Sequence, residues 1–352
     1  MRNHSAVGLV VYLEAFFLFY NFLLCVDTNL INDRMKQSFG FHPVINQVGV
    51  DTQKEVVKEE KRLKVDNEAY GAVITQVKKS LFTKHPYHWD IDGSMAHIDA
   101  AKLEEFQAFN KKFYVPNNAV LVVAGNFEIP QAIQWIKKYY DSIKKGAAVD
   151  KMNIAETPIT QTIKARYEDA NIQVPAIVAA YRTPSMKTQD SRVLELISTI
   201  LSDGKSSRLY KKIVDDKKIA LQVGAFTTNQ EDYGMYILYG LPLGQNTTES
   251  ILKEIDEEIV KLQTDLISER DFQKLQNTIE NDFVNNNASL ERVAENLASY
   301  YLLYGDVNLI NTEIAAYRAI TREDIRNVAK KYLNPNQRLL LDYVPVKDKS
   351  QN

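Results

Sequence analysis

The chain is poor in the residues that build cross-linked or metal-clustered proteins. Its 352 residues include one cysteine, Cys25, and five histidines, at positions 4, 42, 85, 88 and 97. A single cysteine excludes an internal disulfide framework and a zinc site made of cysteines alone. The cysteine count therefore does not indicate the redox compartment.

An excess of charge of one sign is also lacking. The chain has 43 Lys and Arg against 45 Asp and Glu, a net charge of −2. Because nucleic-acid binding depends on clustered positive charge, we expect no nucleic-acid partner. Hydrophobic residues make up 45% and charged residues 25% of the chain, as in ordinary globular proteins. A chain of this length can form two domains with full cores.

The longest apolar run lies in residues 1–45, an N-terminal segment unlike the rest. It extends from Ala6 to Val26 and, as a helix, is long enough to span a bilayer. Glu14 lies near its middle, where a carboxylate costs about 2.5–3.5 kcal/mol on insertion scales. No small-x-small cleavage site follows. Three interpretations of this segment therefore stay open. It is a buried helix or domain remnant, a signal peptide or membrane anchor, or a segment with another role. The chain is membrane-associated or exported if the segment is a signal or anchor, and its compartment is otherwise unknown.

A densely charged helix is predicted over residues 51–66. Asp51 is the expected N-cap, and Asp66 and Asn67 are expected to end the helix. Its apolar stripe is formed by Val56, Val57, Leu63 and Val65.

The periodicity of the remaining chain predicts an α+β protein. Helices are expected at about 70–82, 99–114, 133–140, 190–201, 247–263, 268–304 and from 321, the second of them capped by Asp99. Strands are expected at about 119–124, 161–168, 174–181, 220–227, 235–241 and 338–344. Residues 119–124 lack polar alternation, which predicts a strand covered on both faces.

Three segments resemble the pitrilysin/insulinase-type zinc metallopeptidases, the inverzincins. The segment Lys54-Glu55-Val56-Val57-Lys58-Glu59-Glu60 fits the family's basic, any, hydrophobic, hydrophobic, any, any, Glu pattern. The most specific match is a helix followed by Tyr114-Val115-Pro116-Asn117-Asn118, the apolar strand and Gly125. The turn Gly204-Lys205-Ser206-Ser207-Arg208-Leu209 resembles the family's Gly-x-Ser-Ser-Arg-Leu, in which Arg208 is expected to hold the turn. A P-loop is disfavoured there, because Thr199 stands where its first glycine belongs.

The resemblance implies that Glu60 is the third zinc ligand. The family's second Glu, seven residues earlier, is replaced by Gln53, and no H-x-x-E-H occurs in the sequence. The family places that motif further before the third ligand than Met1 lies before Glu60, so the resemblance implies that the catalytic helix is absent. We therefore expect that zinc, the family's cofactor, is not bound by this chain alone, because zinc sites need three or four protein ligands. His85 and His88 have metal-ligand spacing, but Pro86 lies between them and no third nitrogen or sulfur ligand is near.

The resemblance also implies the domain organisation. Two sister α+β domains are expected, each a mostly antiparallel sheet packed on helices, with the first incomplete. The expected bounds are 46–145 for the zinc-bearing domain, 146–160 for a linker, 161–346 for the second domain and 347–352 for a tail. In the family's substrate-gripping half an Arg and a Tyr lie beyond the Gly-x-Ser-Ser-Arg-Leu turn. Val214 and Leu221 occupy those positions here, which favours the zinc-bearing half.

Three hypotheses about function follow. The chain is a truncated or non-catalytic member of a zinc metalloendopeptidase family, a non-catalytic subunit that forms a peptide-binding chamber with an active half, or an enzyme whose missing ligands come from another polypeptide. The implied partners are peptides or unfolded polypeptide, bound by strand addition, and a second peptidase half or subunit.

Overall fold

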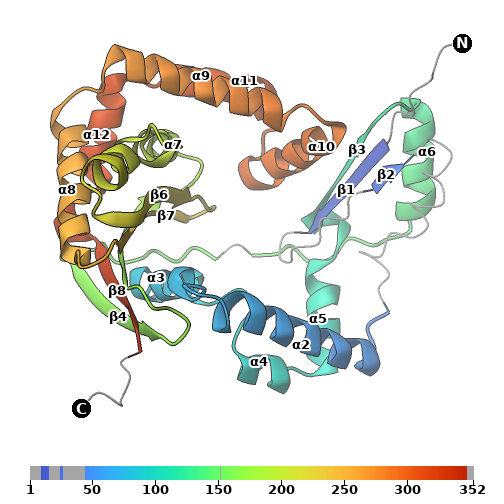
Figure 1. Cartoon of the computed structure of the whole chain (residues 1–352). Helices are drawn as coiled ribbons and strands as arrows, with labels where there is room; N and C mark the ends of the chain where they lie inside the picture. Colours follow the sequence, from blue (N-terminus) through green and yellow to red (C-terminus); the bar gives the residue numbers. More distant parts are fainter. Residues whose placement is uncertain (1–8, 16–23, 27–43, 151, 347–352) are drawn as a thin grey trace, which may run out of the picture. The chain divides into compact units, whose positions relative to one another are not determined.

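The computed structural model describes residues 44–150 and 152–346, together with the backbone of 9–15 and 24–26 (Figure 1). The strands are β1 (Leu9–Ala15), β2 (Leu24–Val26), β3 (Ala119–Ala124), β4 (Ile163–Asp169), β5 (Ala176–Pro184), β6 (Ala220–Thr228), β7 (Tyr233–Pro242) and β8 (Leu339–Pro345). The α-helices are α2 (Gln47–Lys61), α3 (Val73–Leu81), α4 (Met95–Ala100), α5 (Leu103–Phe113), α6 (Ile129–Tyr140), α7 (Gln189–Ser202), α8 (Thr248–Thr264), α9 (Glu269–Asn286), α10 (Leu290–Ser299), α11 (Leu309–Arg318) and α12 (Arg322–Tyr332).

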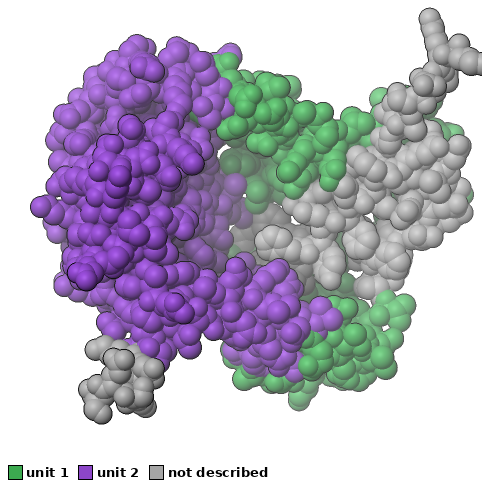
Figure 2. All heavy atoms as spheres, viewed as in Figure 1, with its two compact units in different colours: residues 1–55, 96–152, 279–314 green, residues 56–95, 153–278, 315–352 purple. Residues whose placement is uncertain are grey.

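Shorter helical turns complete the chain. The π-helical turns are η1 (Arg62–Asp66), η4 (Tyr210–Asp216) and η5 (Tyr300–Tyr304), and the 3₁₀ turns are η2 (Pro86–His88), η3 (Pro116–Asn118) and η6 (Pro335–Gln337). The chain divides into two compact units, coloured in Figure 2. Unit 1 comprises residues 1–55, 96–152 and 279–314, and unit 2 comprises 56–95, 153–278 and 315–352.

Unit 2 is an α+β domain built on a mixed five-stranded sheet of order β4-β8-β5-β7-β6. The pairs β8–β5, β5–β7 and β7–β6 are antiparallel, and β4 runs parallel to β8. The strands predicted near 220–227 and 235–241 are therefore direct neighbours in this sheet.

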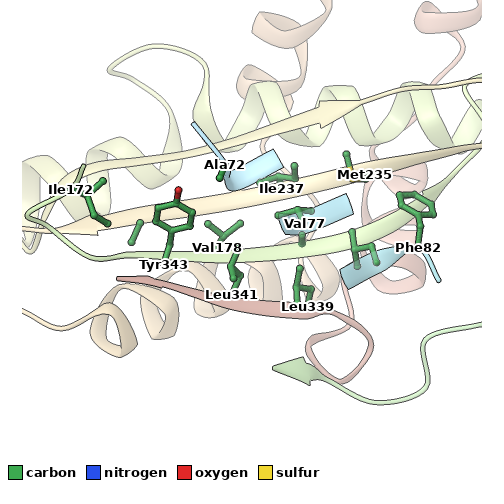
Figure 3. Packing of buried hydrophobic residues seen from close by; sticks show 13 residues of the cluster. Ala72, Val77, Phe82, Ile172, Val178, Met235, Ile237, Leu339, Leu341 and Tyr343 are labelled. Atoms are coloured by element: carbon green, nitrogen blue, oxygen red, sulfur yellow. The ribbon is translucent and has the colours of Figure 1, made fainter. Parts of the chain in front are cut away.

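One face of this sheet packs against α3. Val77 of α3 is fully buried in a cluster with Val178, Ile237 and Leu341 of three neighbouring strands (Figure 3). Leu81 of the same helix is fully buried in this cluster as well. Helices α7, α8 and α12 also pack in this unit, where α12 contacts both of the others. Thr188, Thr247 and Thr321 cap the three helices by accepting a backbone N–H, which explains their sharp beginnings.

Unit 1 contains a three-stranded antiparallel sheet of order β2-β1-β3. Leu121 and Val123 of β3 belong to the same apolar cluster as Trp135 and Ile136 of α6. Val120, Val122 and Ala124 pack against Ala294 and Ala298 of α10. Strand β3 thus has helices on both faces, as its sequence predicts, although each of its six residues is only half-buried.

The predicted helix starts need correction. Helix α2 begins at Gln47, so the prediction of Asp51 as N-cap is wrong; the Oδ1 atom of Asn46 accepts the Gly49 N–H at 2.8 Å instead. Asp99 lies inside α4, and the next helix follows Lys102, whose N–H donates to Glu105 Oε2 at 2.7 Å. In both places the true cap satisfies backbone N–H groups that a helix start leaves unpaired.

One longer prediction also fails. A single helix over 268–304 is wrong, because α9 ends at Asn286 and Ser289 caps a new helix, α10. In the apolar run 6–26, for which the sequence leaves several interpretations open, the described residues 9–15 and 24–26 are strands, and the rest of the run lies outside the described residues. An apolar run does not by itself distinguish a helix from buried strands. Within the residues that the structure describes, no helix is long and apolar enough to cross a membrane.

Candidate functional site

Glu60 lies in the last turn of α2, where the sequence predicts the third zinc ligand. Its carboxylate pairs with the ammonium group of Lys64, one turn further on, and its side chain is 48% exposed. Glu59 faces elsewhere and pairs with Arg62 at 3.1 Å, as expected for neighbours about 100° apart on a helix. A basic partner therefore holds the Glu60 carboxylate.

The helix end behind Glu60 is a π-helical turn, η1, fixed to the loop between β4 and β5 of unit 2. Asn67 N–H donates to Arg62 O at 2.8 Å, and the Asn171 side chain donates to Asp66 O at 2.7 Å. Tyr70 OH donates to Val174 O at 2.7 Å. π-turns are frequent at functional sites, where they reposition neighbouring side chains. The predicted end at Asp66 and Asn67 is confirmed.

Gly71 is required by the close approach of the backbone at this turn. A Cβ atom at Gly71 would lie 2.7 Å from Val65 O and 2.8 Å from Lys64 O, closer than real side chains come. The Tyr70-Gly71 pair of the sequence thus marks the place where the chain doubles back under the end of α2.

The described residues do not fit a zinc ion on their own. Among them, no three His, Cys, Asp or Glu side chains converge as metal ligands. The one implied ligand, Glu60, is paired with Lys64. His4 and His42 lie outside the described residues. The structure thus places Glu60 at the predicted position on its helix, and among the described residues no further metal ligand lies beside it.

His85 has a structural role. Only 3% of it is exposed, and its Nε2 atom lies 3.2 Å from Asp232 Oδ2 while its Nδ1 atom accepts the Tyr87 N–H at 3.3 Å. His88 Nδ1 lies 2.8 Å from the carbonyl oxygen of His85. The pair with metal-ligand spacing is therefore used for packing and hydrogen bonding around the 3₁₀ turn η2.

Glu156 of unit 2 is a buried carboxylate held by several hydrogen bonds, and the sequence did not predict it. Its Oε1 atom accepts the N–H groups of Thr83, Lys84 and His85, each at 2.7 Å. Burial alone would raise the pKa of this carboxyl, but the three N–H donors and Arg182, 3.5 Å away, lower the pKa to about 2. The carboxylate ties the 153–159 segment to the loop after α3.

Arg182 completes this cluster from β5. Its guanidinium donates to Thr157 O at 2.8 Å and to Leu81 O, and it lies over the rings of Phe82 and Tyr233. Burial lowers the pKa of Arg182, and Glu156 opposes this. The carboxylate of this cluster comes from a segment without helical or strand periodicity. The sequence pattern therefore did not indicate that Glu156 and Arg182 lie together.

The turn at Gly204 borders a cavity of about 110 Å³ between α7 and α9. Gly204 has φ +69°, and the turn closes with Ser207 N–H to Gly204 O at 3.1 Å. Lys274 Nζ donates to Ser206 Oγ at 2.7 Å. Lys274 thus contacts this turn, and Arg208 lines the cavity; the expected role of Arg208 in holding the turn stays a prediction.

Comparisons with known proteins agree with this architecture. The family model described as "Peptidase M16 inactive domain" matches residues 100–279. A zinc protease from Helicobacter pylori, "Zinc protease PqqE", is 25% identical over 287 residues; the match covers 81% of this chain and 64% of that protein, under two thirds of its length.

Two solved structures share the fold. The crystal structure of a protease from Helicobacter pylori superimposes with a TM-score of 0.84 at 22% identity, covering 91% of this chain and 78% of that one. A chain of complex III2 from Candida albicans superimposes with a TM-score of 0.74 at 15% identity, covering 92% and 78%. The chain belongs to the M16, or pitrilysin, family of peptidases and matches the family's inactive-domain type.

Proposed function

We propose that this chain is a non-catalytic M16 component that supplies the third-ligand helix and a peptide-binding sheet. The observation that carries the proposal is the combination of the family's Glu pattern at Glu60 with a sequence that contains no H-x-x-E-H. In an M16 peptidase two histidines of that motif and one Glu hold Zn²⁺, which activates a water for attack on the peptide carbonyl. One carboxylate does not hold zinc, so the chain does not hydrolyse peptides by itself.

The local structure supports the proposal that Glu60 becomes a zinc ligand when other residues supply the remaining ligands. The π-turn and the bonds from Tyr70 and Asn171 fix the end of α2 without using the Glu60 carboxylate. Lys64, 68% exposed, holds that carboxylate by a surface ion pair, which is worth about 0–1 kcal/mol. Two histidines and a divalent cation brought to this position would displace Lys64 at little cost.

A repeated segment supports two sister domains. Residues 102–124 and 321–343 have the same elements in the same places without an insertion. Helices α5 and α12 have 11 residues each, both begin with an N-cap N–H that donates to the acidic side chain at the third helical position, and both lead through a Pro-containing 3₁₀ turn into a strand. The proposed bounds are 46–145 and 161–346, with 146–160 as linker.

Peptide binding is proposed at the outer edge of β6, which among the described strands pairs with β7 alone. Strand β4, at the other edge of the five-stranded sheet, carries Lys164, Arg166 and Glu168, charges that guard an edge against further pairing. Strand β6 carries no charged residue, and Leu221 is 51% exposed. An extended peptide can therefore add to β6 by backbone hydrogen bonds.

A second candidate is a non-catalytic subunit that forms a chamber with an active half. The similar chain in Candida albicans complex III2 favours it, because that chain is part of a multi-subunit assembly. Both candidates predict a partner that carries H-x-x-E-H. They differ in whether Glu60 contributes to the zinc site of the assembly.

The test mixes this chain with an M16 polypeptide segment that carries H-x-x-E-H. We expect one zinc ion per complex and peptide hydrolysis only in the mixture, with both lost in Glu60→Gln and retained in the matched control Glu59→Gln. Equal zinc content and activity in the Glu60→Gln mixture would favour the chamber subunit. Zinc-dependent hydrolysis by the chain alone would refute both.

A further inference from the structure

We infer that the cavity between α7 and α9 is a binding site for a small oxyanion, a phosphate or a carboxylate group, bound by Ser207, Arg208 and Lys274. All three residues line the cavity, and all three belong to unit 2. The inference does not depend on the proposed function, because it uses neither Glu60 nor the peptide edge of β6.

A buried hydroxyl group without a partner points to a ligand. Ser207 is 4% exposed, and its Oγ atom is buried without a hydrogen-bond partner among the described residues. The backbone N–H of the same residue is already used, since it donates to Gly204 O at 3.1 Å and closes the turn. Burying a hydroxyl without a hydrogen bond costs free energy. A ligand oxygen that accepts the Ser207 proton would recover it.

Two basic side chains at the cavity have donors left for a ligand. Lys274 Nζ donates one of its three protons to Ser206 Oγ at 2.7 Å. Arg208 is half-buried, and the contacts of the described residues include no hydrogen bond or ion pair to its guanidinium. A guanidinium has five N–H donors in a planar fork, which matches the oxygens of a phosphate or a carboxylate. Arg208 is therefore the main anchor for the anion.

Two carboxylates at the cavity, those of Asp203 and Asp271, oppose an anion. Both belong to exposed residues, where water weakens the effect of their charges. Among the ion pairs of the described residues, none joins either carboxylate to Arg208 or Lys274. Both positive charges therefore remain available to an anion.

The volume of the cavity limits the ligand. A volume of about 110 Å³ corresponds to roughly three or four water molecules at about 30 Å³ each. A single phosphate or carboxylate group fits this space, whereas a whole nucleotide does not. The site therefore differs from a P-loop, in which backbone N–H groups hold the phosphates of a nucleotide.

Thermal unfolding of the full chain in inorganic phosphate, acetate or chloride at constant ionic strength tests the site. We expect phosphate or acetate to raise the melting temperature in a saturable way, with a Kd of about 1 mM, and the anion that binds more tightly identifies the source of the oxyanion. Phosphate also stabilises proteins because it is excluded from their surface, but that effect does not saturate and is the same in all variants.

Substitutions at the cavity separate binding from this general effect. Arg208→Gln should weaken phosphate binding about tenfold or more, and Ser207→Ala should weaken it about threefold. The matched control is Lys205→Gln, a charge in the same turn that does not line the cavity, and it should leave the Kd unchanged. Equal Kd values in wild type and Arg208→Gln, or no saturable effect of either anion beyond chloride, overturn the inference.

Asp271→Asn distinguishes an anion from a cation. Removal of this carboxylate should tighten phosphate binding about threefold, because it removes a repulsive charge. Stabilisation of the wild type by Mg²⁺ or Ca²⁺ that is lost in Asp271→Asn would mean a cation site and overturns the inference. If a variant does not fold, a phosphate titration of the wild type followed by NMR decides the question. The Ser207 and Arg208 amide signals should shift with the same Kd, and unshifted signals overturn the inference.

Discussion

The Glu156 cluster yields a quantitative prediction for stability. Burial raises the pKa of this carboxyl, but three backbone N–H groups at 2.7 Å and the nearby Arg182 outweigh it and lower the pKa from 4.5 to about 2. Because the pKa is lower in the folded state, the ionised carboxylate stabilises the fold above pH 4.5, and this stabilisation is lost as the pH falls toward 2. At pH 7 the contribution is about 3 kcal/mol.

Glu156→Gln removes this charge while keeping the shape of the side chain. We expect the free energy of unfolding to fall by about 3 kcal/mol at pH 7, and the difference from wild type to shrink below pH 4.5. Urea unfolding followed by circular dichroism at several pH values measures both. The matched control is Glu168→Gln, whose carboxylate is 52% exposed and 3.5 Å from Arg166, and which should change stability by less than about 1 kcal/mol. A Glu156→Gln protein as stable as wild type at pH 7, or a difference independent of pH, would refute the reasoning.

Three further predictions concern the fold and the proposed peptide edge. Gly71→Ala should lower the free energy of unfolding, measured in urea, by about 1–3 kcal/mol, because the added Cβ would meet backbone oxygens. The control Gly49→Ala in α2 should leave the free energy of unfolding nearly unchanged. Equal effects of the two substitutions would contradict the account of the turn. Leu81→Ala should lower the free energy of unfolding by about 2–5 kcal/mol and lower the melting temperature. Leu63→Ala, at a position that is 60% exposed, should lower the free energy of unfolding by less than about 0.5 kcal/mol. Gln222→Lys should weaken binding of an uncharged extended peptide about tenfold in fluorescence anisotropy, and Lys164→Gln should leave it unchanged. Unaltered affinity in Gln222→Lys would exclude β6 as the peptide edge.

Periodic, capped elements could be predicted from the sequence. Helices α7, α8 and α12 and the strands of unit 2 begin and end close to their predicted positions, because apolar spacing and Thr caps specify them locally. The break between α9 and α10 has no Gly or Pro, and Ser289 alone caps the new helix. The π-turn η1 is held by contacts with residues distant in the sequence, such as Asn171, so the local sequence pattern did not predict it.

The candidate site was predictable only where one helix carries it. The position of Glu60 on the last turn of α2 follows from the local pattern, and so does Lys64 four residues later, a spacing that places two side chains on one helix face. The Glu156 cluster joins residues 83–85 to residue 156 and to Arg182, and no local pattern specifies such long-range contacts.

The most direct test of the central claim is the zinc content and peptidase activity of the purified chain beside its Glu60→Gln variant. The proposed function predicts no stoichiometric zinc and no hydrolysis in either protein. Stoichiometric zinc in the chain alone that disappears in Glu60→Gln would contradict it, because residues of this chain would then complete the metal site.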